Sequence, residues 1–390
     1  MPMPIYSLLI LALLALPLGA EELKIHGFVA QGIIQADDSN FVEDNGDVSF
    51  KLTEVGINAS YKLNNQLRIA GQGVYLNGGN RYPEGLRIDY LFVDWQLQNN
   101  ADWQLKMQLG RNKNYHWLYS STRDVPHTRP SIILPQSMYF DAFRDFALGV
   151  DGIAGMLNTQ NSWGEWDLNL SYGSVHVSDK QKANLLGTYA PGDLKHDKDA
   201  QMSLFWRPHN SQWLLGLSLL EVEFSYDRSQ DDIFVDGQQR TRRINLHALY
   251  QGQSWELASE WVREHNVLGG LLFPQYISNT SSDGGYLQAR YFVSPTLTLM
   301  TRLDVYDRDR KDRHGKQLEI DSGYRIPYYF GFMDQATLGL SWKLAKNLQL
   351  QGEYHRVKGT GHLAPVLTPN TIANDSLYWN VWAFQLMYWF

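Results

Sequence analysis

Hydrophobic and polar residues alternate along much of this chain. In residues 165–174 apolar side chains alternate with polar ones, and in residues 297–306 Leu297, Leu299, Leu303 and Val305 oppose Thr298, Met300, Arg302 and Asp304. Residues 337–354 repeat the alternation on either side of Lys346 and Asn347. A period of two places successive side chains on opposite faces of a β-strand. These apolar faces alone fit either a soluble β-sandwich or a β-barrel.

The connections between the strands favour the barrel. Short turns are predicted at 64–65, 99–100, 158–163, 208–212, 252–253, 294–295 and 346–347. They alternate with longer polar connections at 36–46, 79–86, 112–145, 178–198, 226–240, 265–283, 307–334 and 359–376. Outer-membrane barrels have short periplasmic turns, longer external loops and tilted strands of about 9–11 residues. The sequence predicts an all-β, antiparallel transmembrane barrel of about 16 strands, with weaker strand patterns at 23–35, 47–62 and 199–207.

The last segment, "SLYWNVWAFQLMYWF", has aromatic and apolar residues at alternate positions up to Phe390. Tyr and Trp suit a bilayer boundary because each ring has an apolar body and a polar edge. A terminal aromatic residue also resembles the carboxy-terminal assembly signal of bacterial outer-membrane proteins.

The first segment is predicted to be a signal peptide. Its apolar run from Leu8 to Leu16 is followed by Pro17 and by small residues at Gly19 and Ala20. Such a run is too short to span a bilayer and precedes a small-residue cleavage site. We expect residues 1–20 to be removed on export and residues 21–390 to form the barrel.

Composition excludes several classes of site. The chain has no cysteine, so it has neither disulfides nor thiolate metal sites. Its formal net charge of −7 argues against nucleic acid as a partner. The eleven histidines are scattered and show no zinc-ligand spacing. No cofactor or metal is therefore expected.

The connection at 112–145 is long enough to be functional. Its stretch "STRDVPHTRPSIILPQ" contains three prolines, which discourage a regular strand. The whole connection is also rich in aromatic and aliphatic residues, so it must pack against something. We expect it to fold inward against the barrel wall and to narrow the pore.

The stretch "GRNKNYHWLYSSTRDVPHTRPSIILPQSMYFDAFRDFALG" resembles the corresponding region of Gram-negative porins related to the phosphate-selective porin family. In that group a glycine and basic residues end a strand, a Ser-Ser-Arg-like element follows, and a long third loop folds into the channel. The matching residues here are Gly110, Arg111, Lys113, Ser120, Ser121, Arg123 and Arg144. The resemblance implies a porin with an inward third loop, and a homotrimer. It does not imply phosphate selectivity, because the runs that follow the basic pair differ.

Charges in this region define a candidate constriction site. The predicted constriction or solute-contact residues are Arg111, Lys113, Arg123, His127, Arg129 and Arg144. Five of these are cations at neutral pH, against Asp124, Asp141 and Asp145. In a narrow pore such an excess biases ion selectivity. The alternative is that these cations form ion pairs that only fix the loop.

Other charges are predicted to face the lumen if the apolar faces contact lipid. These lumen-wall residues are Lys106, Glu256, Glu260, Arg290, Arg302 and Asp304. The set mixes both signs and does not identify a solute. The sequence predicts a passive diffusion channel for small hydrophilic solutes, weakly anion-preferring, in the outer membrane of a Gram-negative bacterium.

Two other functions stay open. The stretch "SYGSVHVSD" supplies Ser174, His176, Ser178 and Asp179, which an outer-membrane lipid or ester hydrolase could use. Nothing in their spacing establishes an oriented base or an oxyanion site, so we expect no enzyme. A structural or adhesive barrel is the other alternative, although the chain has no repeat or coiled coil.

Overall fold

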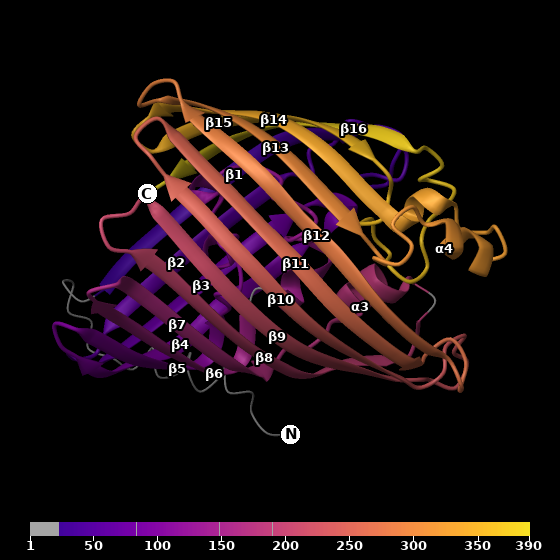
Figure 1. The fold of residues 1–390 in the computed structure, drawn as a ribbon, viewed down its shortest axis with the longest axis horizontal. Helices are drawn as coiled ribbons and strands as arrows, with labels where there is room; N and C mark the ends of the chain where they lie inside the picture. Colours follow the sequence, from indigo (N-terminus) through magenta and orange to yellow (C-terminus); the bar gives the residue numbers. More distant parts are fainter. Residues whose placement is uncertain (1–22, 83, 148, 189) are drawn as a thin grey trace.

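A computed structural model of the chain describes residues 23–390 except 83, 148 and 189. The predicted signal peptide, residues 1–20, lies outside the described residues. Sixteen antiparallel strands form one closed barrel, which confirms the predicted fold class (Figure 1). The strands are β1 (Leu23–Ala36), β2 (Thr53–Lys62), β3 (Leu67–Asn77), β4 (Gly85–Asn99), β5 (Trp103–Lys113), β6 (Gly149–Asn161), β7 (Gly164–Ser174), β8 (Asp193–Pro208), β9 (Trp213–Asp227), β10 (Gly237–Gln251), β11 (Trp255–Gly270), β12 (Ile277–Phe292), β13 (Leu297–Asp307), β14 (Phe332–Ala345), β15 (Leu348–Lys358) and β16 (Tyr378–Trp389).

The first and last strands close the barrel. β1 pairs with β16 in a register that places Phe28 opposite Trp389. Beyond the strand end, the Phe390 amide donates to the Gly27 carbonyl at 3.0 Å, and the Gly27 amide donates back at 3.1 Å. Closure removes the free sheet edges, which lipid cannot satisfy with hydrogen bonds.

The two faces of the wall have the predicted polarity. On β13, Leu303 is 60% exposed on the outside, whereas Arg302 and Asp304 are fully buried on the inside. Leu338 on β14 is 64% exposed in the same way. This outer apolar surface is that of a barrel whose wall contacts lipid. None of the helices in the described part of the chain is long and apolar enough to cross a bilayer.

Strand lengths differ from the sequence prediction on one side of the barrel. β8 to β12 have 15 or 16 residues each, so they include residues assigned above to the connections 178–198 and 265–283. The misassignment arose because the loop-side ends of these strands carry polar or charged residues at outward positions, such as Lys195, Lys198 and Arg240, where the rest of each strand carries apolar ones. Conversely, residues 47–52 precede β2 and form only an isolated bridge at Ser49.

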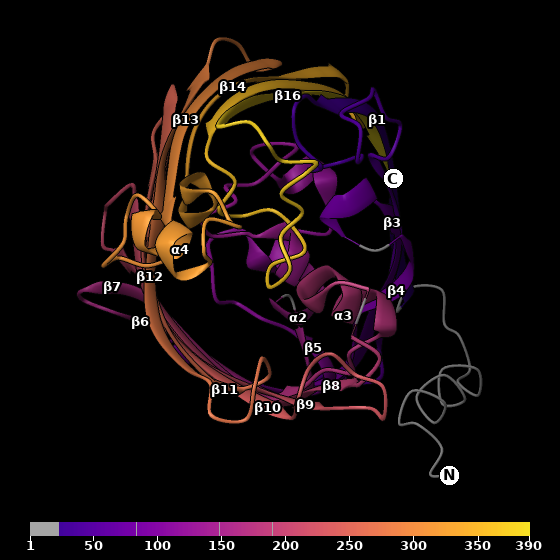
Figure 2. The same ribbon diagram turned by 90° about the vertical axis from the view of Figure 1, so that its right-hand side faces the viewer.

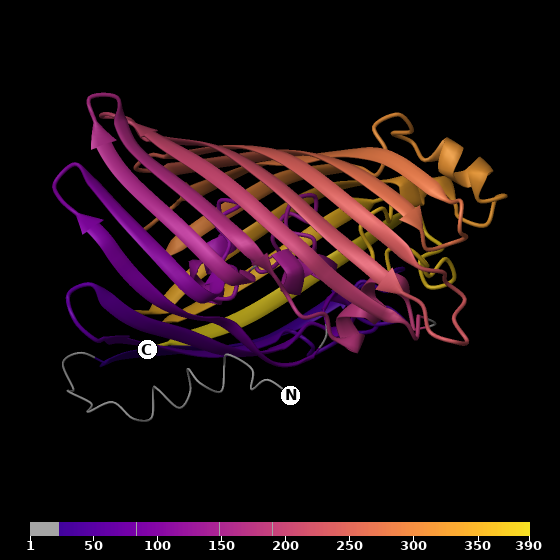
Figure 3. The ribbon, with the colours of Figure 1, turned by 90° about the horizontal axis from the view of Figure 1, so that it is seen from below.

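The long connections fill much of the barrel interior, whereas the short turns lie at the opposite, periplasmic end. Figure 2 shows the segment between β5 and β6 and the segment before β16 inside the ring of strands. α4 lies beyond the loop ends of the strands, and Figure 3 shows how obliquely the strands run. The helical segments are η1 (Gly79–Arg81), η2 (Ser120–Thr122), η3 (Pro126–Thr128), η4 (Asp141–Phe143), α2 (Arg144–Ala147), α3 (Asp179–Leu186), α4 (Lys316–Asp321) and η5 (Tyr328–Gly331).

Candidate constriction and lumen chambers

Residues 114–147, here called the constriction loop, lie between β5 and β6 and cross the lumen. The approach to the loop needs a glycine: Gly110 has φ of +127°, and a Cβ there would lie 2.4 Å from the Leu91 carbonyl oxygen. Three short helices, η2, η3 and η4, turn the chain repeatedly, and η3 begins with Pro126. The predicted inward loop is confirmed, although it begins at residue 114 rather than 112, because β5 ends at Lys113.

Apolar residues of the loop pack against two parts of the wall. Ile132 and Ile133 join a buried cluster with residues of β1, β14, β15 and β16. Trp117 and Met138 join another buried cluster with residues of β11 and β12, including Tyr286. Because the loop follows β5, this apolar burial against β11 to β16 and β1 holds it across the lumen.

A buried ion-pair network fixes the loop to β2. Arg129 donates to both carboxylate oxygens of Glu54, at 2.6 and 3.1 Å. Arg144 lies 3.6 Å from the same carboxylate, and its Nε donates to Asp124 at 2.8 Å. All four side chains are at most 3% exposed, so each charge depends on its partner rather than on water.

A second part of the network joins the loop to the connection before β4. Arg81 Nε donates to Asp141 at 2.8 Å, and Arg123 donates to the other oxygen of Asp141 at 2.7 Å. Burial alone would raise the pKa of Asp141, but Arg81, Arg123 and Arg144 outweigh it and hold that pKa below its ordinary value. Lys113, at the end of β5, pairs with Asp89 at 2.6 Å.

Polar wall residues also hold the backbone of the loop. Glu260 accepts hydrogen bonds from the Leu118 amide at 3.0 Å and from the hydroxyl groups of Tyr139 and Tyr286. Glu353 accepts from the Ile132 and Ile133 amides. Arg302 donates to the Ile133 carbonyl at 3.0 Å and to Ser131 at 3.1 Å. The loop's conformation is therefore specified by the wall.

The predicted site residues divide into two groups. The structure brings Arg123, Arg129 and Arg144 together in the network, with Lys113 beside it. The others lie apart from this network. Arg111 is 3.7 Å from Asp151, and Arg290 pairs with Glu256 at 2.8 Å. Lys106 is half-buried on β5 with no ion pair to a described carboxylate, Asp304 is buried on β13, and the His127 ring stacks on Trp389 with centroids 4.4 Å apart.

Sequence reasoning missed the wall partners of the loop, namely Glu54, Arg81 and Asp89. Each is buried, yet none lies in the 112–145 connection or in a recognisable motif. For Glu54 and Asp89 the only available signal was an acidic residue at a lumen-facing strand position, which applies equally to many other carboxylates. Arg81 lies in the connection before β4, where no pattern singles it out. Only the register and the path of the loop identify these partners.

Open space lies on both sides of the constriction loop. The outer chamber has a volume of about 240 Å³ and a side pocket of about 80 Å³; its lining includes Phe140, Phe143, Leu185, Leu186, Phe224, Arg243, Glu264, Arg308, Val366 and Leu367. The periplasmic chamber has a volume of about 630 Å³, and its lining includes His127, Thr128, Arg129, Arg290, Ser294, Lys343 and Gln349. These two chambers share no lining residue, and the loop contributes to both.

A hydrogen-bonded series on the inner wall has the order of a hydrolase triad. Ser218 Oγ lies 2.8 Å from His247 Nε2, and His247 Nδ1 lies 2.6 Å from Glu260. However, Ser218 is fully buried, and neither chamber is lined by Ser218 or His247. Glu260 also anchors the constriction loop. The series is therefore part of that buried polar network, and the Ser218 hydroxyl opens onto neither chamber.

The hydrolase candidates singled out in the sequence have local structural roles. Ser178 caps α3: its hydroxyl accepts from the Gln181 amide, and the Gln181 side chain accepts from the Ser178 amide. Asp179 is exposed and pairs with Lys182 at 3.0 Å. Within the described residues, no hydrogen bond joins Ser174 to His176.

Comparison with solved structures places this fold among porins. The chain matches an anion-selective porin from Comamonas acidovorans (TM-score 0.56, 12% identity, 94% of this chain and 99% of that one). It also matches outer-membrane expressed OmpT of Vibrio cholerae (0.55, 10%, 94% and 97%) and Salmonella typhi OmpF in complex with daunomycin (0.54, 11%, 94% and 97%). No protein-family model and no curated protein matches the sequence. Sequence identities of 10–12% show a shared fold and do not support membership of a phosphate-selective group. The chain has the barrel fold of outer-membrane porins.

Proposed function

We propose that the protein is a passive outer-membrane channel for small solutes, with the constriction loop as its narrowest part. The observation that carries this proposal is the position of the loop across a closed barrel, with open space on each side of it. A wall with an apolar exterior and a charged interior suits a water-containing passage through lipid. Solutes would pass between the chambers along the surface of the loop.

The lining of the outer chamber supports a preference for solutes with an apolar body and an anionic group. Phe140 and Phe143 of the constriction loop meet Leu185 of α3 and Val366 of the last loop in one lining. An aromatic or aliphatic body would gain from displacing water from these side chains.

The charges of the same chamber support the anionic part of this preference. Arg243 Nε donates to Glu264 at 2.7 Å, so these two charges largely offset each other. Arg308 forms no ion pair with a described carboxylate, and it leaves the outer chamber with an excess positive charge. A single cation in a confined space attracts anions more strongly than one in bulk solvent.

For the six predicted constriction residues we propose two roles. Arg123, Arg129, Arg144 and Lys113 act mainly as a scaffold because each is buried against a carboxylate. Arg111 and His127 lie at the margins of this scaffold and contribute little to selectivity. Weak anion preference then arises chiefly from Arg308 rather than from the loop cations.

Reversal potential in a salt gradient tests this assignment. Arg308→Ala should reduce the anion preference at low salt while leaving the folded barrel intact. Arg356→Ala is the matched control, because that arginine is exposed on the outer wall of β15. An unchanged reversal potential for Arg308→Ala would remove this arginine from the selectivity site. The same preference can be tested without mutation. Benzoate should enter liposomes that contain the parent protein faster than benzylamine does.

We also propose that the barrel assembles as a homotrimer, as the porin resemblance implies. Electrophoretic migration with and without boiling tests this proposal. A heat-sensitive band at three times the barrel mass supports the trimer, whereas a heat-sensitive band at the monomer position contradicts it.

A further inference from the structure

The outer wall of β8 to β12 carries charged side chains where the apolar surface ends. On each of these strands the outward positions change from apolar to charged toward the loop end. One group on β8, β9 and β10 consists of Lys198, Glu221, Glu223, Arg240 and Arg242. A second group on β11, β12 and the following connections consists of Arg263, Asp283, Asp307, Arg310 and Arg313. We call the two groups together the outer-wall cluster.

The first group has more cations than carboxylates. Glu221 accepts from Lys198 at 2.5 Å, from Arg240 at 2.7 Å and from Arg242 Nε at 2.7 Å. Glu223 lies 3.2 Å from Arg240 and 3.9 Å from Lys198. Three cations therefore share two carboxylates, and the side chains of Lys198, Arg240 and Arg242 are 30%, 46% and 57% exposed.

The second group repeats this arrangement. Arg263 donates to both oxygens of Asp283, at 2.7 and 3.1 Å. Arg310 and Arg313 lie 3.7 and 3.9 Å from the same carboxylate, and Arg313 lies 3.6 Å from Asp307. The side chain of Arg313 is 60% exposed whereas that of Asp283 is 11% exposed. In this group the cation is therefore more exposed to solvent than the carboxylate beside it.

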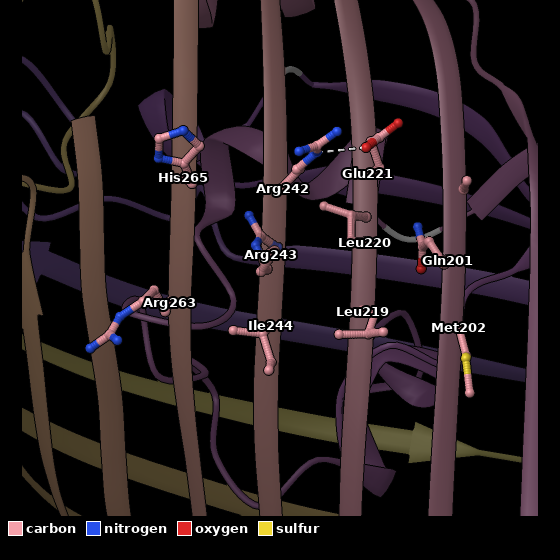
Figure 4. A pocket seen from close by; sticks show the side chains of 11 residues that line it. Gln201, Met202, Leu219, Leu220, Glu221, Arg242, Arg243, Ile244, Arg263 and His265 are labelled. Atoms are coloured by element: carbon pink, nitrogen blue, oxygen red, sulfur yellow. Dashed lines mark hydrogen bonds and ion pairs between the residues drawn. The ribbon is translucent and has the colours of Figure 1, made fainter. Parts of the chain in front are cut away.

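Apolar side chains lie directly below the charges. Figure 4 shows Arg242 and Glu221 in one row across the strands. Two residues further from the loop end, Ile244, Leu219 and Met202 form another row, which Arg263 continues on β11. These rows line a shallow groove of about 580 Å³ on the wall. The groove therefore combines a cationic upper rim with a floor that is apolar on β8 to β10 and ends at Arg263 on β11.

The cluster lies at the height where the outer boundary of the lipid is expected. Trp213 begins β9 at the periplasmic end and is exposed on the wall. With a rise of about 3.4 Å per residue and a tilt of about 40°, Glu221 lies about 21 Å above Trp213, and Glu223 about 26 Å above it. The apolar band of such barrels is about 25 Å tall. The charges therefore meet the headgroups of the outer leaflet.

We propose that the outer-wall cluster binds the headgroup of a phosphorylated outer-leaflet glycolipid. The two groups centre on β9 and β12, three strand spacings or about 14 Å apart, so two phosphates of one headgroup can reach both. Arginine binds phosphate through paired N–H donors, and each group has donors free for this. The acyl chains lie along Leu219 and Ile244. This inference concerns the outside of the wall and does not depend on which solute crosses the lumen.

Binding of lipid A, a diphosphorylated glycolipid, tests the proposal directly. The folded protein in zwitterionic detergent is titrated with fluorescent lipid A at low salt, and the same titration is made with Arg242→Gln/Arg263→Gln. We expect at least a tenfold loss of affinity for this variant. The control, Arg207→Gln/Arg356→Gln, removes two cations elsewhere on the barrel and should bind within twofold of the parent.

Further arms separate the alternatives. Lipid A without phosphates should bind tenfold more weakly to the parent, and equal binding would overturn the proposal. Inorganic phosphate at the same phosphate concentration should displace little lipid; equal displacement would show an anion site instead of a lipid site. If Arg242→Gln/Arg263→Gln loses its oligomer by cross-linking but binds lipid A normally, the surface contacts a second copy of the chain and the proposal is wrong. Heat-modifiable migration confirms that each variant is folded.

Discussion

Arg129 in the constriction loop forms a two-point ion pair with Glu54 on β2, although 75 residues separate them in the sequence. Both side chains are almost fully buried, and Arg144 shares the same carboxylate. A loop that depended only on apolar contacts could slide along the wall. The planar geometry of a guanidinium on a carboxylate fixes its position instead. The ion pair thus fixes the loop to the barrel wall, and the position of the loop sets the width of the passage.

Replacing Glu54 should release the loop. Glu54→Ala leaves Arg129 and Arg144 without this carboxylate in a buried site, which costs on the order of 3–5 kcal/mol. We expect a lower midpoint in urea unfolding and a noisier, larger single-channel conductance, because the loop no longer keeps one position.

An exposed ion pair supplies the control for this change. Lys195 pairs with Asp227 at 2.5 Å on the surface, with both side chains about half exposed. Lys195→Ala should leave the urea midpoint and the conductance close to those of the parent. If Glu54→Ala behaves like Lys195→Ala, the network does not hold the loop.

Acid should weaken the contact between the last loop and the constriction loop. His362 stacks on Phe140 with centroids 4.4 Å apart, and its Nδ1 lies 2.8 Å from the Gln136 carbonyl oxygen. Burial lowers the pKa of His362 to about 3. Between about pH 6.5, near the pKa of an unfolded histidine, and pH 3, the unfolded chain binds a proton at His362 that the folded chain does not bind. The free energy of unfolding therefore falls as the pH falls from about 6.5 toward 3.

The loss amounts to about 1.4 kcal/mol per pH unit below about 6.5. Between pH 7 and pH 4.5 we therefore expect increasing current fluctuations in single-channel recordings. His362→Phe keeps an aromatic ring at this position and cannot be protonated, so its fluctuations should change less with pH. Equal pH dependence in the parent and in His362→Phe would show that this histidine does not control the contact.

Ser218 should not react as a hydrolase nucleophile. Its hydroxyl bonds to His247, but the side chain is fully buried and borders neither chamber. A fluorophosphonate probe should therefore leave the folded protein unlabelled, and Ser218→Ala should conduct as the parent does. Labelling of the parent that Ser218→Ala abolishes would favour the outer-membrane hydrolase alternative instead.

The fold was predictable because lipid imposes a simple pattern on strands. Alternation in residues such as Leu303 and Asp304 shows directly which side faces lipid and which faces the lumen. The loop-side ends of β8 to β12 broke this pattern, since residues such as Lys198 and Arg240 stand outside the lipid and were assigned to polar loops. Their length became apparent only from strand pairing.

The candidate site was predictable in part. Prolines and aromatic residues in the 112–145 connection indicated a packed, inward loop, and the structure confirms it. Whether Arg123 and Arg129 were free or paired depended on Asp141 and Glu54, and on a path through the lumen that no local pattern encodes. Arg308 was missed because it follows directly after β13 in a connection with many other charges.

The central claim is that this barrel conducts small solutes past a fixed loop. Single-channel recording of the folded protein in planar bilayers tests it most directly. We predict stable, stepwise, ohmic conductance at pH 7, with a reversal potential in a salt gradient shifted modestly toward that of the anion. Protein that is folded by heat-modifiable migration, and inserted into the bilayer, but shows no conductance would contradict the account.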